Sequence, residues 1–143
     1  MGGSGRLYRQ LRENLGLVYN INTVSACYED VGFLGIRAVC APENVDEVRI
    51  KIINEWDSLQ QNWIEATELA AVKGNYAGTL ARRFETNLSV AGIFGIEALL
   101  SSIETFKQAV ERINLVTADN ILTAAQQYLS TSCFVSSTLG PSD

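Results

Sequence analysis

Residues 5–19 read GRLYRQLRENLGLVY, and their order predicts a short helix that leads directly into a strand. Leucine recurs at every fourth position, so that one face of a helix over residues 5–15 would carry Leu7, Leu11 and Leu15. Gly16 follows the last of these leucines, and glycine commonly occupies the position just after a helix C-terminus. The pattern therefore predicts a helix that packs on a core through its leucines.

A β-hairpin is predicted next. Its strands, residues 18–26 and 33–40, are rich in β-branched and apolar residues, and a polar turn separates them. With the turn centred on Glu29 and Asp30, the apolar face pairs Tyr19 with Cys40, Ile21 with Ala38 and Thr23 with Ile36. The wetter face then pairs Asn20 with Val39 and Asn22 with Arg37. One covered face and one wet face is usual for an antiparallel sheet.

An amphipathic helix is predicted over residues 42–61. Pro42 and the acidic residues that follow it suit the first turn of a helix. The apolar stripe of this helix comprises Val45, Val48, Ile52, Trp56 and Leu59. Apolar residues at this spacing lie on one face, which is typical of an amphipathic helix.

Helices dominate the rest of the chain. They are predicted over residues 65–85, 88–100, 102–114 and 118–129, with a break near Ser101 and Ser102, a cap at Thr117 and a closing strand over residues 133–139. Gly74 and Gly78 lie inside the first of these helices and favour close packing against a neighbour. Segregated strands and helices indicate an α+β fold with an antiparallel sheet covered on one face by helices. We expect residues 1–143 to form a single domain.

The composition narrows the classes of function. A net charge of −5 with interspersed signs argues against nucleic-acid binding, which needs a basic face. No apolar run approaches the roughly 18 residues of a membrane span. The cysteines, Cys27, Cys40 and Cys133, lack zinc-binding spacing and are expected to be small buried side chains, with a labile or regulatory thiol as the alternative. The chain contains no histidine, so its serines and cysteines lack a histidine base.

Four motifs follow one another in a recognisable order. The pattern R-L-[YF]-x-x-[LI]-R-E, then G-L-x-Y, is matched by residues 6–13 and 16–19, and a proline and acidic helix start follows the hairpin at residues 41–44. An E-L-x-x-[AV]-K segment occupies residues 68–73, and R-I…V-T-x-[ED]…Y-L spans residues 112–129. Together they resemble the second, zinc-free half-domain of the inverted-motif zinc peptidases. This family includes pitrilysin, insulin-degrading enzyme and the mitochondrial processing peptidase.

The resemblance implies how the chain would work. In that family two homologous halves close around a chamber, and the first half binds zinc through an H-x-x-E-H helix. A chain without histidine cannot carry that site, so no metal or other cofactor is expected here and the zinc is expected in the other half-domain. Alone, the chain should be inactive. The implied partners are a zinc-bearing N-terminal half-domain or partner subunit and a peptide or unfolded protein as substrate.

The resemblance also singles out two residues. The family's second half supplies an arginine and, seven residues later, a tyrosine that reach the substrate, and the matching positions are Arg12 and Tyr19. A phenol can donate to the oxyanion that develops on the scissile carbonyl, and a guanidinium can hold a peptide carbonyl. By residue type alone, Arg12 suits a solvated helix face and Tyr19 a half-buried strand position. Strand alternation places Tyr19 on the apolar face, whereas substrate contact requires an exposed hydroxyl, unless the strand begins irregularly.

Two functions stay open at this point. The chain completes the chamber of a zinc metallopeptidase, or it is a non-catalytic structural or interaction subunit that pairs with a catalytic partner. The start, MGGSG, lacks the features of a signal peptide. By resemblance, a first strand and helix are expected upstream of it. The sheet should therefore have an open edge that favours self-association or docking onto a partner. The compartment is not indicated.

Overall fold

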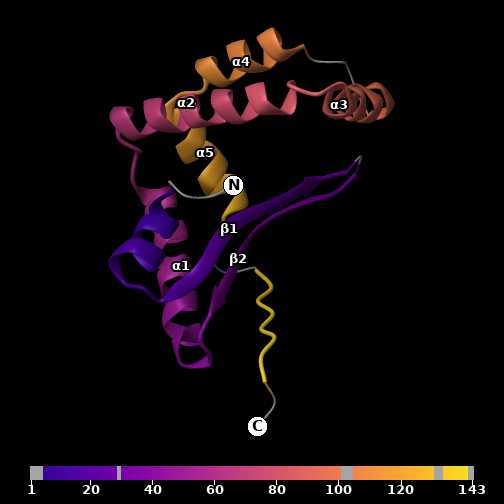
Figure 1. Cartoon of the computed structure of the whole chain (residues 1–143). Helices are drawn as coiled ribbons and strands as arrows, with labels where there is room; N and C mark the ends of the chain where they lie inside the picture. The colour runs from indigo at the N-terminus through magenta and orange to yellow at the C-terminus, as the bar shows by residue number, and fades with distance from the viewer. Residues whose placement is uncertain (1–4, 29, 101–104, 131–133, 142–143) are drawn as a thin grey trace. The chain divides into compact units, whose positions relative to one another are not determined.

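The computed structural model describes residues 5–28, 30–100, 105–130 and 134–141 (Figure 1). The chain divides into two compact units, one of Met1–Gln60 with Tyr128–Asp143 and one of Gln61–Gln127. The first contains an antiparallel sheet and the second is helical, which is the α+β class predicted from the sequence. No described helix combines the length and apolarity needed to cross a membrane. That residues 1–143 form a single domain stays a prediction.

The first unit begins with η1 (Tyr8–Asn14), a π-helix, where the sequence predicts a helix. Leu11 is completely buried and Leu7 is half-buried. Leu15 is 46% exposed, so the prediction that it shares the apolar face is wrong. A π-helix places more residues in each turn than an α-helix, and residues four apart therefore drift off a common face. Gly16 has a φ of 63°, the left-handed conformation expected of a glycine after a helix.

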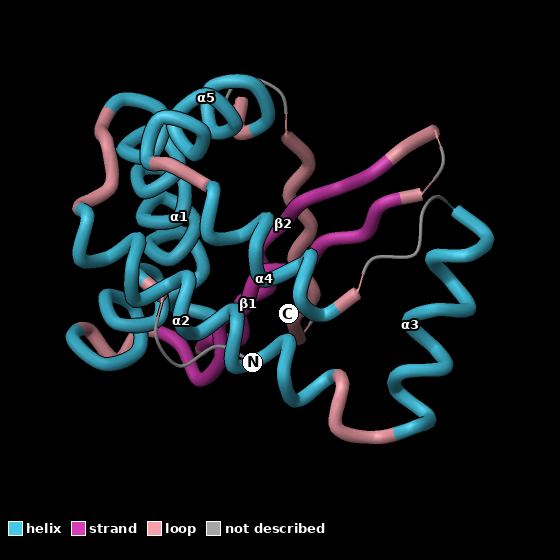
Figure 2. Tube along the Cα trace, turned by 90° about the horizontal axis from the view of Figure 1, so that it is seen from above, coloured by secondary structure: helices cyan, strands magenta, loops and turns pink. Residues whose placement is uncertain are grey.

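β1 (Val18–Cys27) and β2 (Gly32–Cys40) form the hairpin, drawn in magenta in Figure 2. The predicted register is confirmed for the pairs Asn20–Val39, Ile21–Ala38, Asn22–Arg37 and Thr23–Ile36. The predicted pairing of Tyr19 with Cys40 is wrong, because Cys40 lies opposite Val18 and the ladder is irregular at the residue after Val18. A β-bulge of this kind adds one residue to a strand and leaves it unpaired.

One face of the hairpin packs on η1 and on α1 (Val45–Gln61), which follows the short 3₁₀ turn η2 (Pro42–Asn44). The buried cluster combines residues from all three elements: Leu11, Val18, Ile21 and Val48. Partly buried side chains surround it: Leu7, Tyr8, Leu17, Ile36, Ala38, Cys40 and Ile52. The covered face of the hairpin and the amphipathic helix predicted over residues 42–61 are both confirmed by this cluster.

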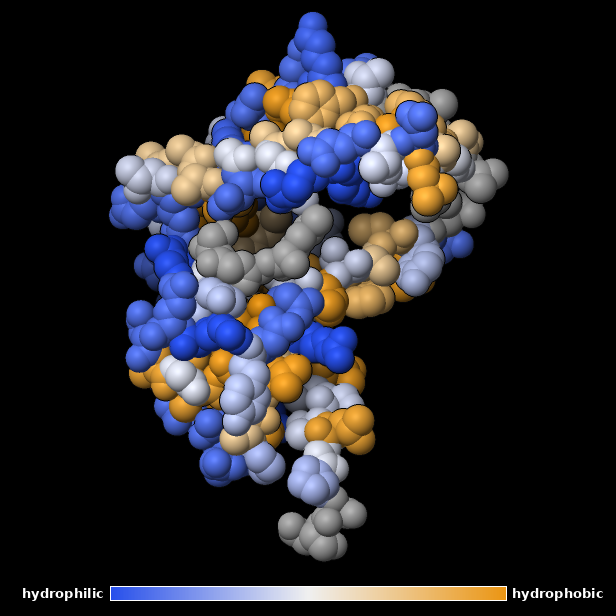
Figure 3. All heavy atoms as spheres, viewed as in Figure 1, coloured by the Kyte–Doolittle hydropathy of each residue, from blue (hydrophilic) through white to orange (hydrophobic). Residues whose placement is uncertain are grey.

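The end of the hairpin away from this cluster is uncovered. Four large apolar side chains there are each more than half exposed: Tyr28 at 65%, Val31 at 67%, Phe33 at 56% and Leu34 at 52%. Exposed apolar residues, drawn in orange, also reach the surface elsewhere (Figure 3). An isolated two-stranded hairpin is only marginally stable in water. The stability of this hairpin therefore depends on the end that packs against the core.

The second unit is built from four helices, α2 (Ala66–Arg83), α3 (Asn87–Leu100), α4 (Phe106–Leu115) and α5 (Ala118–Tyr128), the last of which ends one residue beyond the unit. All four occur where the sequence predicts helices. The predicted cap is confirmed, because the backbone N–H of Asn120 donates to Thr117 Oγ1 at 3.1 Å. The predicted break at Ser101 and Ser102 lies outside the described residues.

Side-chain contacts join the helices of the second unit. The Lys73 ammonium of α2 donates to the carbonyl of Asn114 in α4 at 2.8 Å, and the two helices lie side by side in Figure 1. Phe84 contacts the rings of Phe94 and Phe106 edge-on. The prediction of close packing at Gly74 and Gly78 is wrong. A Cβ at Gly74 would have no described atom within 4 Å, and one at Gly78 would meet only the end of an arginine side chain at 3.9 Å.

The closing strand predicted over residues 133–139 is not found in the part that the structure describes. Residues 134–141 contain neither helix nor strand, and the described sheet has two strands. Side chains hold this segment to α1: the Phe134 ring packs edge-on against Trp56, and Thr138 Oγ1 accepts a hydrogen bond from Arg49 at 3.3 Å. These side-chain contacts replace the backbone ladder that a strand would require.

Candidate functional site

Arg12 lies in the last turn of η1 and is exposed. Its guanidinium carbon sits over the ring of Tyr8, 5.7 Å from the ring centroid, which is within the range of a cation–π contact. Its chain neighbour Leu11 is completely buried. The buried leucine fixes the helix on the core, and the arginine beside it therefore projects from a well-anchored backbone.

Tyr19 is 66% exposed, although the residue before it, Val18, is only 4% exposed. The bulge produces this difference. Asn20 and Ile21 resume the regular ladder, with Ile21 only 3% exposed, so that two residues separate the two buried positions of β1 instead of one. Tyr19 consequently leaves the apolar face, and the conflict between strand alternation and an exposed hydroxyl is resolved by the irregular strand start.

Two hydrogen bonds fix the backbone between Arg12 and Tyr19, one at the N–H of Leu17 and one at its carbonyl. Its N–H donates to the carbonyl of Leu11 at 2.8 Å, and its carbonyl accepts a hydrogen bond from the side-chain amide of Asn44 at 3.4 Å. Gly16 supplies the left-handed turn immediately before it. The structure therefore fixes the connection between the two residues, which both lie on the first unit with their side chains exposed.

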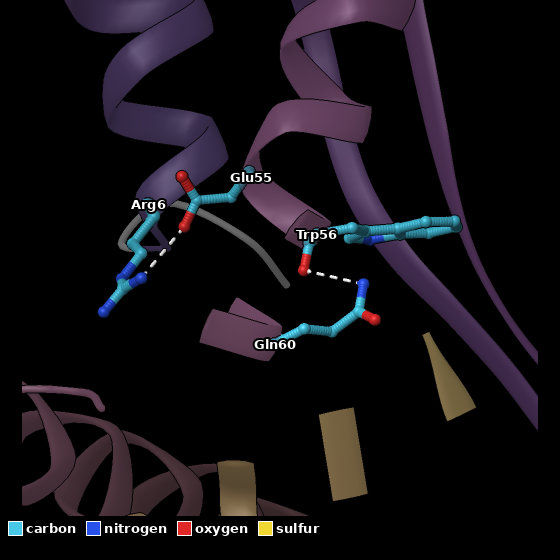
Figure 4. Close-up of polar contacts among 4 residues, drawn as sticks. All are labelled: Arg6, Glu55, Trp56 and Gln60. Atoms are coloured by element: carbon cyan, nitrogen blue, oxygen red, sulfur yellow. Dashed lines mark hydrogen bonds and ion pairs between the residues drawn. The ribbon is translucent and has the colours of Figure 1, made fainter. Parts of the chain in front are cut away.

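An ion pair ties the start of this segment to α1. The guanidinium of Arg6 lies 3.0 Å from Glu55 Oε1, and the two side chains are 28% and 17% exposed. Figure 4 shows these two side chains pointing toward one another. It also shows the side-chain amide of Gln60 donating to the carbonyl of Trp56, one turn earlier in α1. Sequence reasoning missed this pair because its partners are 49 residues apart. It also missed the contacts of Tyr8 and Asn44, for which the sequence carries no periodic signal.

The residues that the structure describes do not form the kind of side-chain group that holds a zinc ion. The full sequence has no histidine, and no three Cys, Asp or Glu side chains converge among the residues that the structure describes. Cys27 is exposed, so its predicted burial is wrong, because it lies at the uncovered end of the hairpin. Cys40 is half-buried against the core, and Cys133 lies outside the described residues. The candidate site consists of the Tyr19 phenol and the Arg12 guanidinium, which are both hydrogen-bond donors.

Residues 1–76 match the family model described as the Peptidase M16 inactive domain. The chain is 26% identical over 130 residues to an uncharacterized zinc protease of Mycobacterium tuberculosis, and 27% identical over 130 residues to one of Bacillus subtilis. These alignments cover 90% and 89% of this chain but only 30% and 32% of the relatives. The chain is also 31% identical over 85 residues to the mitochondrial-processing peptidase subunit beta of Dictyostelium discoideum, covering 50% of this chain and 18% of that protein.

Two solved structures share the fold. A protease from Helicobacter pylori aligns with a TM-score of 0.79 at 19% identity, covering 91% of this chain and 32% of that one. A chain of complex III2 from Candida albicans aligns with a TM-score of 0.78 at 22% identity, covering 87% and 30%. The chain thus spans about a third of the length of these two zinc proteases and of the two solved chains.

Proposed function

The chain belongs to the family of M16 peptidase inactive domains, and we propose that it completes the substrate chamber of a zinc peptidase by presenting Arg12 and Tyr19 to the bound peptide. The observation that carries this proposal is the exposure of both side chains at the two ends of one fixed connection. A regular strand would have turned Tyr19 toward the core. The bulge instead leaves its hydroxyl free to meet a substrate.

Each side chain has a distinct role in the proposal. The Tyr19 hydroxyl donates a hydrogen bond to the oxyanion that develops when water attacks the scissile carbonyl, and it interacts more strongly with that charge than with the ground-state carbonyl. The Arg12 guanidinium binds a carbonyl of the substrate backbone. Both act by hydrogen bonding, so they assist a reaction whose metal belongs to the other half of the peptidase.

The partner in this proposal is a half-domain or subunit that carries the H-x-x-E-H zinc motif. The relatives named as zinc proteases are about three times as long as this chain, which leaves room in such proteins for a zinc-bearing half. The substrate class is a peptide or an unfolded protein, because an extended backbone exposes the carbonyl groups that both side chains would contact.

Reconstitution tests the proposal. The purified chain is mixed with a zinc-bearing half, and hydrolysis of a fluorogenic peptide is measured for each component and for the mixture. We expect turnover only in the mixture, and we expect Arg12→Ala to lower kcat/KM there. Arg9→Ala is the matched control, since Arg9 is exposed on the same helix. Equal rates for wild type and Arg12→Ala would count against substrate contact by this residue.

A second function is that of a non-catalytic structural or interaction subunit, and the match to a family model described as an inactive domain supports it. The two functions differ in one outcome. A structural subunit binds its partner with the same affinity whether or not Arg12 and Tyr19 are intact, and it leaves peptide turnover unchanged when they are substituted.

A further inference from the structure

Tyr8 stands out among the residues around the candidate site because it faces both the core and Arg12. Its side chain is half-buried and packs against the cluster of buried residues that joins η1, β1 and α1. The guanidinium carbon of Arg12 lies over the same ring, 5.7 Å from its centroid. The ring is thereby fixed by the core on one side and available as a platform on the other.

Arg12 needs such a platform. It is exposed, and among the described residues the Tyr8 ring is the contact that the structure records for its guanidinium. A free arginine side chain samples many rotamers and loses that freedom on binding a substrate. A planar guanidinium stacks readily on an aromatic face, and this narrows the rotamers before substrate arrives.

We propose that Tyr8 is a positioning residue, whose ring holds the Arg12 guanidinium in the orientation that binds the substrate backbone. This inference rests on the proposed function of Arg12. The ring face acts and the phenol hydroxyl does not, because the contact is made to the ring. Tyr8→Phe therefore preserves the effect, and Tyr8→Leu removes it while keeping an apolar side chain against the core.

The kinetic test uses the reconstituted peptidase with Tyr8→Leu, Tyr8→Phe, Arg12→Ala and the double variant Tyr8→Leu/Arg12→Ala. A cation–π contact at an exposed site corresponds to about a 2- to 5-fold effect, so we expect Tyr8→Leu to lower kcat/KM by about 2- to 5-fold. Tyr8→Phe should match wild type. The double variant should be no slower than Arg12→Ala, because the ring acts only through the arginine.

A second readout does not depend on activity. In NMR spectra of the full chain, the side-chain signals of Arg12 should show the ring-current shift of a group lying over an aromatic face. The shift should persist in Tyr8→Phe and vanish in Tyr8→Leu, while the signals of Arg49, whose guanidinium contacts Asp46 and Thr138, stay unchanged. Absence of the shift in the wild-type chain would overturn the inference even if Tyr8→Leu fails to fold.

The outcomes separate this inference from the proposed function. If Arg12→Ala lowers kcat/KM and Tyr8→Leu does not, the positioning role of Tyr8 is wrong and the role of Arg12 stands. Additive losses in the double variant likewise show that Tyr8 acts independently of Arg12. If Arg12→Ala leaves kcat/KM unchanged, the proposed role of Arg12 fails and the positioning role fails with it.

Discussion

Val18 lies opposite Cys40 in the hairpin, and this pairing leaves Tyr19 outside the regular ladder. The consequence is visible in the exposure of neighbouring side chains: Val18 is 4% exposed and Tyr19 is 66% exposed. A shift of one residue in register exchanges the two faces of a strand, so the bulge decides whether Tyr19 faces the core or the solvent.

The buried leucine of η1 should dominate the stability of the first unit. Leu11→Ala removes a completely buried side chain and should lower the free energy of unfolding by about 2–5 kcal/mol. Leu15→Ala is the matched control, since Leu15 is 46% exposed and should change stability by about 0.5 kcal/mol or less. Urea unfolding of both variants checks this prediction, and equal losses would contradict the burial of Leu11 and the exposure of Leu15.

Substitution by alanine should change the stability in opposite directions at two glycines. Gly16 has a φ of 63°, which an alanine adopts at a cost of about 1–2 kcal/mol, so Gly16→Ala should lower the melting temperature. Gly74 lies inside α2 with open space around it, and Gly74→Ala should stabilise the helix by about 0.5–1 kcal/mol. Thermal unfolding measures both. A stabilising Gly16→Ala would contradict the left-handed turn between η1 and β1.

The ion pair between Arg6 and Glu55 should make a modest contribution that depends on salt. Glu55→Gln should lower the free energy of unfolding by about 0.5–1 kcal/mol, because both side chains are partly exposed. The loss should shrink at high ionic strength, where screening weakens the attraction. Glu47→Gln, at a more exposed pair with Lys51, serves as the comparison. A loss that is independent of salt would indicate that Glu55 acts through packing.

The sheet should promote association through its uncovered strands. Both outer edges of the hairpin lack a partner strand among the described residues, and an open edge of this kind pairs readily with another chain. We expect light scattering to show self-association that increases with concentration. Phe33→Lys places a charge on an exposed apolar position of β2 and should reduce it. A monomer at every concentration would contradict the prediction.

Local sequence patterns predicted much of this fold. The features that depend on irregular backbone or on contacts between distant residues could not be predicted. The register at Ile21 and the stripe through Val48 follow from spacing that is visible in the sequence, and both are found in the core. The bulge at Tyr19 could not be read in this way, because alternation assumes a regular strand. The Arg6–Glu55 pair joins residues 49 positions apart and leaves no local signature. Residues 134–141 have strand-like composition, but their side chains contact α1 instead of forming a ladder.

Peptide hydrolysis by the reconstituted peptidase carrying Tyr19→Phe tests the central claim most directly. The substitution removes one hydroxyl from an exposed side chain and should leave the melting temperature nearly unchanged. If that hydroxyl donates to the developing oxyanion, kcat should fall by about 10²-fold or more, as it does when an oxyanion-hole donor is removed. Tyr28→Phe, at an equally exposed tyrosine near the far end of the hairpin, should retain wild-type turnover. Wild-type kcat for Tyr19→Phe would contradict the account and leave Tyr19 as an ordinary surface residue of the strand.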